Sequence, residues 1–188
     1  MPTRAAAQTT YVALLRGINI GASKRVPMAQ LRALLSGLGY ADVTTLLNSG
    51  NAVFRAAGSS AAQHAAAIAA AIERSLGFEV PVIVKSGKEL AAITAGNPLA
   101  GAAENPSRLL VAFVQDPRQV RALEFVRALA APPERFSLGT HAAYLLCPAG
   151  VLKSEAGEAL LGKAGGGVTT RNWATVLKLA ALMDGCGG

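Results

Sequence analysis

The chain opens with an apolar run that fits a buried strand. Residues Tyr11–Leu15 are apolar without alternation, which predicts a strand covered on both faces of its sheet. The chain changes character at Arg16-Gly17, and a glycine-containing basic loop then leads to Pro27, a residue favoured at the first position of a helix. This order of strand, loop and helix brings backbone N–H groups and cations together at one strand end, an arrangement that suits an anion.

The elements that follow predict an α+β fold. A leucine stripe at helical spacing predicts a helix over 27–38 that stops at Gly39. The patterns then predict strands at 41–47, 51–55 and 80–85, a tight hairpin turn at 48–51, and an alanine-rich helix capped by Ser59-Ser60 and ended by Gly77. This succession is β-α-β-β-α-β, the ferredoxin-like pattern.

The second half repeats the pattern with one difference. A helix at 86–95 is followed by strands at 108–115, 135–138 and 142–147, with a helix after Asp116-Pro117 between the first two. Two helices, 154–163 and 172–183, close the chain, with a flexible glycine-rich joint at 162–167 before the last one, so a helix takes the place of a last strand. The sequence therefore predicts two ferredoxin-like subdomains in a pseudo-duplicated arrangement with C-terminal helices. The expected divisions are a disordered lead-in at 1–10, the first subdomain at 11–85, a helix and connecting loop at 86–106, the second subdomain at 107–150, and C-terminal helices and tail at 151–188.

The charge of the chain favours anionic partners. The sequence holds 18 Lys and Arg against 11 Asp and Glu, a formal net charge of +7. The excess lies early, because every acidic residue except Asp42 comes after residue 60. Nucleic acid, an anionic membrane surface and phosphorylated ligands all suit such a chain. The alternative is that these cations are solvated side chains with no common partner, since they form no dense cluster.

The sequence gives little support for a zinc-binding, disulfide-bonded, secreted or membrane-spanning protein. The two cysteines, Cys147 and Cys186, form no CxxC pair, so neither a zinc framework nor a disulfide scaffold is expected. We expect Cys147 to be a buried small hydrophobe and Cys186 to lie in a frayed tail. The sequence has no signal-peptide pattern and no apolar run of about 18 residues. We therefore expect a cytoplasmic protein without metal, cofactor or membrane partner, and leave its oligomeric state open.

The first group of candidate ligand-binding residues follows the first strand. Arg16, at the strand end, can meet a phosphate or carboxylate with its guanidinium fork, and Gly17, Asn19, Lys24 and Arg25 complete the group. The alternative is that Arg16 and Asn19 only tie the loop to backbone carbonyls. The spacing matches neither a P-loop nor a GxGxxG fingerprint.

Two further groups lie in the hairpin turn and before the last helix. Ser49 and Asn51 could hydrogen-bond a ligand, although a turn alone explains them. In Thr169–Trp173, we expect Thr170 to cap the helix and Arg171 to lie in its first turn, where the helix dipole disfavours a cation. A bound anion, or a distant carboxylate, would explain this placement of Arg171 and of Asn172 beside it. No triad, metal site or pair of carboxylates is recognisable, so catalytic residues cannot be named.

Three stretches carry a resemblance to a known family. They read LLRGINIGASKRVPMAQLR from residue 14, NSGNAVF from residue 48 and TTRNWATV from residue 169. The chain resembles a bacterial family of unknown function whose signatures read approximately LLRGINVGG, QSGNVVF and TxRNWxTV. Ala22 and Asn48 depart from that pattern. The signature positions are Arg16, Gly17, Asn19, Ser49, Gly50, Asn51, Arg171, Asn172 and Trp173.

The resemblance implies two ferredoxin-like subdomains and no activity. Three functional hypotheses remain. The first is a binding module for an anionic ligand, with nucleic acid as first candidate. The second is an enzyme on a small phosphorylated or carboxylated substrate held by Arg16 and Arg171. The third is a structural or interaction protein whose signatures lock the fold, and whether the signatures form one site is a hypothesis of its own.

Overall fold

The computed structural model describes residues 7–162 and 165–185. This part of the chain forms two compact units, with residues 7–87 and 181–185 in unit 1 and residues 88–162 and 165–180 in unit 2. The predicted lead-in falls outside the described residues as far as residue 6, and so do Cys186 and two residues of the glycine-rich joint.

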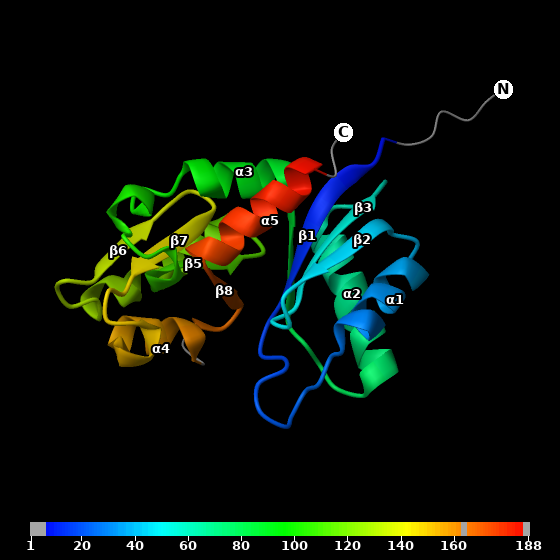
Figure 1. The fold of residues 1–188 in the computed structure, drawn as a ribbon, viewed down its shortest axis with the longest axis horizontal. Coiled ribbons are helices and arrows are strands. Elements are labelled where there is room, and N and C mark those ends of the chain that lie inside the picture. The colour runs from blue at the N-terminus through cyan, green and yellow to red at the C-terminus, as the bar shows by residue number, and fades with distance from the viewer. Residues whose placement is uncertain (1–6, 163–164, 186–188) are drawn as a thin grey trace. The chain divides into compact units, whose positions relative to one another are not determined.

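Unit 1 is a four-stranded antiparallel sheet with two helices on one face (Figure 1). The strands are β1 (Thr9–Leu15), β2 (Ala41–Leu46), β3 (Asn51–Ala56) and β4 (Val82–Ser86), in the order β2-β3-β1-β4. The helices are α1 (Met28–Gly37) and α2 (Ala61–Leu76). The element order is β-α-β-β-α-β, as the sequence predicts.

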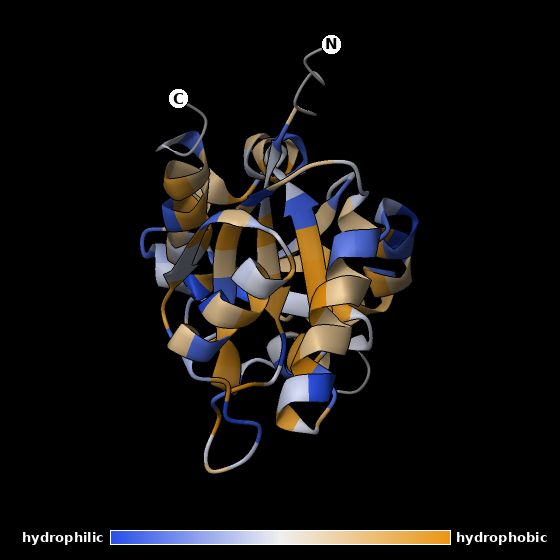
Figure 2. Cartoon of the chain, turned by 90° about the vertical axis from the view of Figure 1, so that its right-hand side faces the viewer, coloured by the Kyte–Doolittle hydropathy of each residue, from blue (hydrophilic) through white to orange (hydrophobic). Residues whose placement is uncertain are grey.

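Strand β1 is one of the two inner strands of unit 1. It pairs with β3 on one side and β4 on the other, and all five residues of Tyr11–Leu15 are buried. Burial on both faces is therefore confirmed. The core between this sheet and the two helices includes Leu31 and Leu35 of α1 and Ile68 and Ile72 of α2. The hydropathy colouring of Figure 2 shows the same division, with strands mostly hydrophobic and helices mixed.

Local signals define both ends of α2. The Ser60 hydroxyl accepts a hydrogen bond from the Gln63 amide at 3.2 Å, and the Gln63 side chain accepts one from the Ser60 amide at 2.8 Å. This reciprocal capping box satisfies two of the N–H groups that a helix start leaves unpaired. Gly77, at φ 77°, ends the helix in the left-handed conformation, as expected.

The predicted hairpin turn is confirmed between β2 and β3, at residues 47–50. Gly50 has φ 84°, and a β-carbon added there would lie 2.7 Å from both Ile18 Cδ1 and Leu15 Cβ. The turn therefore needs glycine at this position for its backbone conformation and for its close packing against the end of β1.

Unit 2 repeats the arrangement with its own sheet and core. Its strands are β5 (Leu109–Val114), β6 (Arg135–Leu138), β7 (Ala142–Leu146) and β8 (Val168–Asn172), in the order β6-β7-β5-β8. The 3-10 helix η3 (Pro117–Ala128) and helix α4 (Glu155–Leu161) pack on the core of this sheet. The remaining helices are α3 (Gly87–Ala95), η1 (Ala100–Ala102), η2 (Pro106–Arg108), η4 (Val151–Lys153) and α5 (Trp173–Gly185), and the division between the units falls inside α5. The predicted α+β fold of two β-α-β-β-α-β units with C-terminal helices is confirmed.

The end of the second unit differs from its prediction in one respect. Strand β8 supplies the last strand that we expected to be missing, and it pairs antiparallel with β5. Thr170 and Arg171 are strand residues, so the predicted Thr170 cap and helical Arg171 are wrong. Asn172 caps α5 instead, because its side-chain oxygen accepts a hydrogen bond from the Thr175 amide at 2.9 Å. The β-branched Val168-Thr169-Thr170 run suits the extended strand better than a helix start.

Two expectations about composition can also be compared with the structure. Cys147 is a buried free cysteine, as predicted, and burial raises the pKa of its thiol. None of the described helices combines the length and the apolar character needed to cross a membrane.

Replacing Gly50 tests the packing of the hairpin turn. We expect Gly50→Ala to destabilise the protein by about 2–4 kcal/mol, because the new methyl group adds a steric clash to an unfavourable positive φ. Gly58→Ala is the matched control, since Gly58 has φ 78° with no atom within 4 Å of an added β-carbon. Gly58→Ala should lower the free energy of unfolding by only about 1 kcal/mol, because alanine is disfavoured at a positive φ and no steric clash is added. Denaturant unfolding of both variants measures the difference, and equal losses would contradict the packing argument.

Candidate functional site

The candidate loop begins where two hydrogen bonds close the end of β1. The Leu15 amide donates to the Gly50 carbonyl at 2.8 Å, and the Arg16 amide donates to the Pro81 carbonyl at 3.0 Å. Beyond them Gly17, at φ 67°, turns the chain out of the sheet. The loop that follows extends past the strands and helices of unit 1 (Figures 1 and 2).

Asn19 holds this loop closed. Its amide nitrogen donates to the Val26 carbonyl at 3.0 Å and to the Asn48 carbonyl at 2.7 Å, and its side-chain oxygen accepts from the Val26 amide at 2.9 Å. The backbone amide of Asn19 also donates to the Lys24 carbonyl at 3.1 Å. Asn19 adopts φ 56°, which asparagine tolerates better than most residues. These contacts give Asn19 the tethering role that the sequence left as an alternative.

The tip of the loop is exposed and basic. Residues 20–25 are all exposed, with Ile20 retaining 73% of its accessible surface. Lys24 and Arg25 form no ion pair with any described residue. Arg16, at the base of the loop, is half-buried. The loop therefore presents two charged side chains beside an apolar one, on a base that Asn19 fixes.

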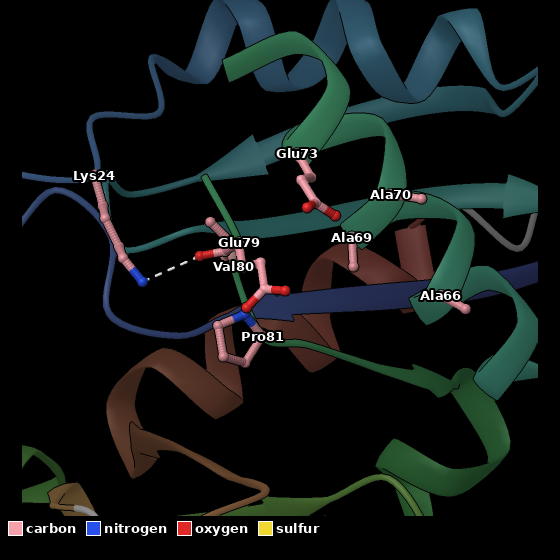
Figure 3. Close-up of a pocket in the computed structure, with 8 residues that line it drawn as sticks. All are labelled: Lys24, Ala66, Ala69, Ala70, Glu73, Glu79, Val80 and Pro81. Atoms are coloured by element: carbon pink, nitrogen blue, oxygen red, sulfur yellow. Dashed lines mark hydrogen bonds between the residues drawn. The ribbon is translucent and has the colours of Figure 1, made fainter. Parts of the chain in front are cut away.

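A pocket lies against one side of this loop (Figure 3). Its volume is about 460 Å³, and three alanines of α2 form one wall. The Lys24 ammonium donates to the backbone carbonyl of Glu79 at 3.1 Å, and the carboxylates of Glu73 and Glu79 also line the pocket. Two carboxylates against one cation make this pocket a poor site for an anion. The exposed tip of the loop, residues 20–25, contains no Asp or Glu.

The hairpin candidates Ser49 and Asn51 are held inside the turn. Asn51 is fully buried, and its amide nitrogen donates to the Leu46 carbonyl at 2.8 Å and to the Ser49 hydroxyl at 2.9 Å. Ser49 itself is exposed. Asn51 thus stabilises the turn in which the Asn48 carbonyl accepts the hydrogen bond from the Asn19 side chain. The signature stretches that begin at residues 14 and 48 are therefore joined by hydrogen bonds.

The third candidate group belongs to unit 2. Arg171 lies in β8 opposite Val111, and its guanidinium donates to the Thr170 carbonyl at 2.8 Å. Burial lowers the pKa of Arg171 to about 10. Asn172 caps α5, and Trp173 is buried. Because this group and the loop lie in separate units, one site containing Arg16 and Arg171 stays a hypothesis.

One pair of titratable side chains was missed by the sequence analysis. The Tyr40 hydroxyl lies 2.8 Å from Nδ1 of His64, and His64 is only 4% exposed. The histidine ring also contacts the rings of Tyr11 and Phe54, with centroids 4.7 and 5.8 Å away. Tyr40 lies in the connection between α1 and β2, whereas His64 lies in α2, and no local motif relates them. The one signal in the sequence was helical spacing, since His64 comes four residues before Ile68 and so shares its face of the helix.

Burial defines the ionisation of this pair. It lowers the pKa of His64, and burial together with Tyr11 raises the pKa of Tyr40. Both groups are therefore neutral near pH 7. Elsewhere in residues 7–162 and 165–185, no three His, Cys, Asp or Glu side chains gather in a way that could hold a metal ion.

The fold and the signature stretches together define a class of protein. Its members have two β-α-β-β-α-β units, and the first strand ends in a basic loop that is held by hydrogen bonds. The chain belongs to the family described as protein of unknown function (DUF1697), whose model matches residues 8–144. These residues include the first two signatures, and the third lies beyond them.

A solved structure supports the same fold. The chain is similar to a conserved bacterial protein of Streptococcus pneumoniae, SP0830, with 27% sequence identity and a TM-score of 0.77. The similarity covers 94% of this chain and 99% of that chain. A comparison with curated proteins found no match.

Removing the Asn19 side chain tests its role in the loop. We expect Asn19→Ala to lose about 1–3 kcal/mol of stability, because three side-chain hydrogen bonds disappear. The Val26 amide, which donates to that side chain, should lose its protection against hydrogen exchange. Asn48→Ala is the matched control, since Asn48 contributes its backbone carbonyl, which the substitution retains. Unchanged protection of Val26 would contradict the tethering role.

The buried His64 predicts a loss of stability in mild acid. Its pKa is lower in the folded protein than the unperturbed value near 6.5, so the unfolded chain takes up a proton first as the pH falls. Stability should therefore decrease below about pH 6.5 and level off once the pH passes the folded pKa. The titratable groups in contact with the ring are the phenols of Tyr11 and Tyr40, which do not ionise in this range.

Urea unfolding at about pH 7.5 and about pH 5 measures this dependence. His64→Asn, which retains a partner for the Tyr40 hydroxyl, should show a smaller difference between the two pH values. An equal difference in the variant would assign the acid sensitivity to other groups.

Proposed function

We propose that this protein is a binding module for nucleic acid and that the loop 16–27 contacts the phosphate backbone. The observation that carries the proposal is the charge of this surface. Lys24 and Arg25 are both exposed on this loop, and no Asp or Glu occurs in residues 7–41. A phosphate chain meeting the tip of the loop is therefore attracted without a competing carboxylate on the same segment.

The expected mode of binding is directed at the backbone. Only 5% of residues are aromatic, so stacking of bases on strand aromatics has little support. Lys and Arg contacts to phosphates need no aromatic residue and carry no sequence preference. Tethering by Asn19 supports the proposal, since a loop closed before binding loses less conformational entropy when it meets a ligand.

Salt dependence is the measurement that tests the proposal. We expect mixed-sequence RNA or duplex DNA to bind in fluorescence anisotropy at low salt, with affinity falling steeply toward physiological salt as counterions are released. Lys24→Ala and Arg25→Ala should each weaken binding and reduce the slope of log K against log salt by about one. Arg16→Ala tests the base of the loop in the same way.

Arg121→Ala is the matched control, because Arg121 is an exposed arginine of unit 2 outside the loop. It removes the same charge and should leave the slope unchanged. Equal effects of Arg121→Ala and Arg25→Ala would indicate general attraction to the basic chain rather than a site. Absence of binding even at low salt would reject nucleic acid and favour the alternative of an enzyme or binder for a small phosphorylated or carboxylated molecule.

A further inference from the structure

A cavity of unit 2 lies at one end of its sheet, where β5 and β6 begin and β7 ends. Its volume is about 370 Å³, within the range of small-molecule sites. The three strands are neighbours in the sheet (Figure 1), and every lining residue belongs to unit 2. Two of the lining residues are arginines, Arg108 and Arg135.

The backbone brings these two arginines to the same end of β7. Arg135 is paired with Leu146 from one side of this strand. Leu109 is paired with Leu146 from the other side, and Arg108 comes directly before it. The Cys147 amide donates to the Arg108 carbonyl at 2.8 Å, so the pairing continues to Arg108 itself. Two strand spacings separate the arginine backbones by about 10 Å, and side chains as long as arginine can reach one ligand across that distance.

The guanidinium of Arg108 has a defined place beside the turn that follows β7. A β-carbon added at Gly150 would overlap Nη1 of Arg108, so the glycine leaves room that the guanidinium occupies. Pro148, in the same turn, lines the cavity. The charged end of Arg108 therefore lies at the wall that Pro148 forms.

Both arginines bring a charge that no described residue neutralises. Each residue is exposed, and neither guanidinium forms an ion pair or a hydrogen bond with a described residue. Glu104 also lines the cavity but pairs with neither arginine. Because a guanidinium binds phosphate or carboxylate through two parallel N–H donors, two such groups in one cavity favour an anion.

The other lining residues favour a single phosphate on a hydroxylated molecule. Two guanidinium groups match the charge of a phosphomonoester, which is about −2 at neutral pH. The carboxylate of Glu104 repels a second anionic group and can accept a hydrogen bond from a hydroxyl group. Pro133, Leu146 and Pro148 provide apolar surface for the carbon atoms of the ligand.

We propose that this cavity binds a small hydroxylated phosphomonoester, whose phosphate contacts Arg108 and Arg135 and whose hydroxyl groups face Glu104. The site belongs to a different unit from the loop 16–27, and it does not depend on nucleic-acid binding.

Calorimetric titration of the intact protein with glycerol 3-phosphate tests the proposal. At constant ionic strength we expect saturable binding, whereas glycerol, which lacks the phosphate, should not bind. Inorganic phosphate should bind more weakly, because it has no hydroxylated carbon chain to contact the rest of the lining. Absence of saturable binding of glycerol 3-phosphate, or equal affinity for inorganic phosphate, would overturn the proposal.

Arginine variants separate the cavity from the general charge of the chain. Arg108→Gln and Arg135→Gln should each lower the affinity for glycerol 3-phosphate about tenfold or more, because each removes charge-assisted hydrogen bonds to the phosphate. Arg121→Gln is the matched control, since it removes the same charge from an exposed position outside the cavity and should leave the affinity unchanged. Equal losses in all three variants, or no loss in either cavity variant, would overturn the proposal.

A glycine variant tests the place of Arg108 without removing its charge. Gly150→Ala should displace the guanidinium and weaken the binding of glycerol 3-phosphate. Gly167→Ala is its control, since Gly167 also has a positive φ but has no atom within 4 Å of an added β-carbon, and its affinity should not change. Wild-type affinity in Gly150→Ala would contradict the position assigned to Arg108. Should Gly150→Ala fail to fold, the arginine variants decide alone, because both arginines are exposed.

Discussion

The organisation of unit 1 depends on how its inner strand β1 ends. Leu15 and Arg16 donate their amides to carbonyls of different neighbours, Gly50 in the hairpin turn and Pro81 before β4. Successive amides of a strand point to opposite sides, so these two bonds fix both flanks of β1 at the same level. The chain must then leave the sheet, and Gly17 turns it outward. Loop, hairpin turn and sheet edge are thus parts of one hydrogen-bonded assembly, and it accounts for most signature residues of this unit.

Sequence patterns predicted those features whose cause is local. Apolar runs placed the strands, and the Ser60 cap and Gly77 placed the ends of α2. Strand β8 was missed because Thr-Thr-Arg-Asn before a helix also has the composition of a cap, and only its pairing with β5 distinguishes the two. The contact between Tyr40 and His64 was missed because it depends on tertiary packing. The sequence identified Asn19 as a candidate but left open whether its side chain binds a ligand or holds the loop. In the structure its side chain forms hydrogen bonds with the backbone of Val26 and Asn48.

The exposed loop and the interior of unit 1 hold their polar groups in different ways. Lys24 and Arg25 lie at the exposed tip of the loop, where attraction to an anion reaches far and selects little. The Tyr40 hydroxyl and His64 Nδ1 meet beside the core of the same unit, where a hydrogen bond acts only at contact distance and depends on geometry. The same small sheet therefore supports both a long-range and a short-range polar interaction.

The buried thiol of Cys147 can report when the core of unit 2 opens. Cys147 follows β7, is buried in the core of that unit, and has a thiol whose pKa burial raises. A thiol that is both shielded and protonated reacts with alkylating reagents only after the surrounding core has opened. With Cys186 replaced, the rate of alkylation of Cys147 would therefore report the stability of the second sheet alone. The alkylation rate of Cys147 thus measures the opening of unit 2, and this opening can be compared with the unfolding of unit 1.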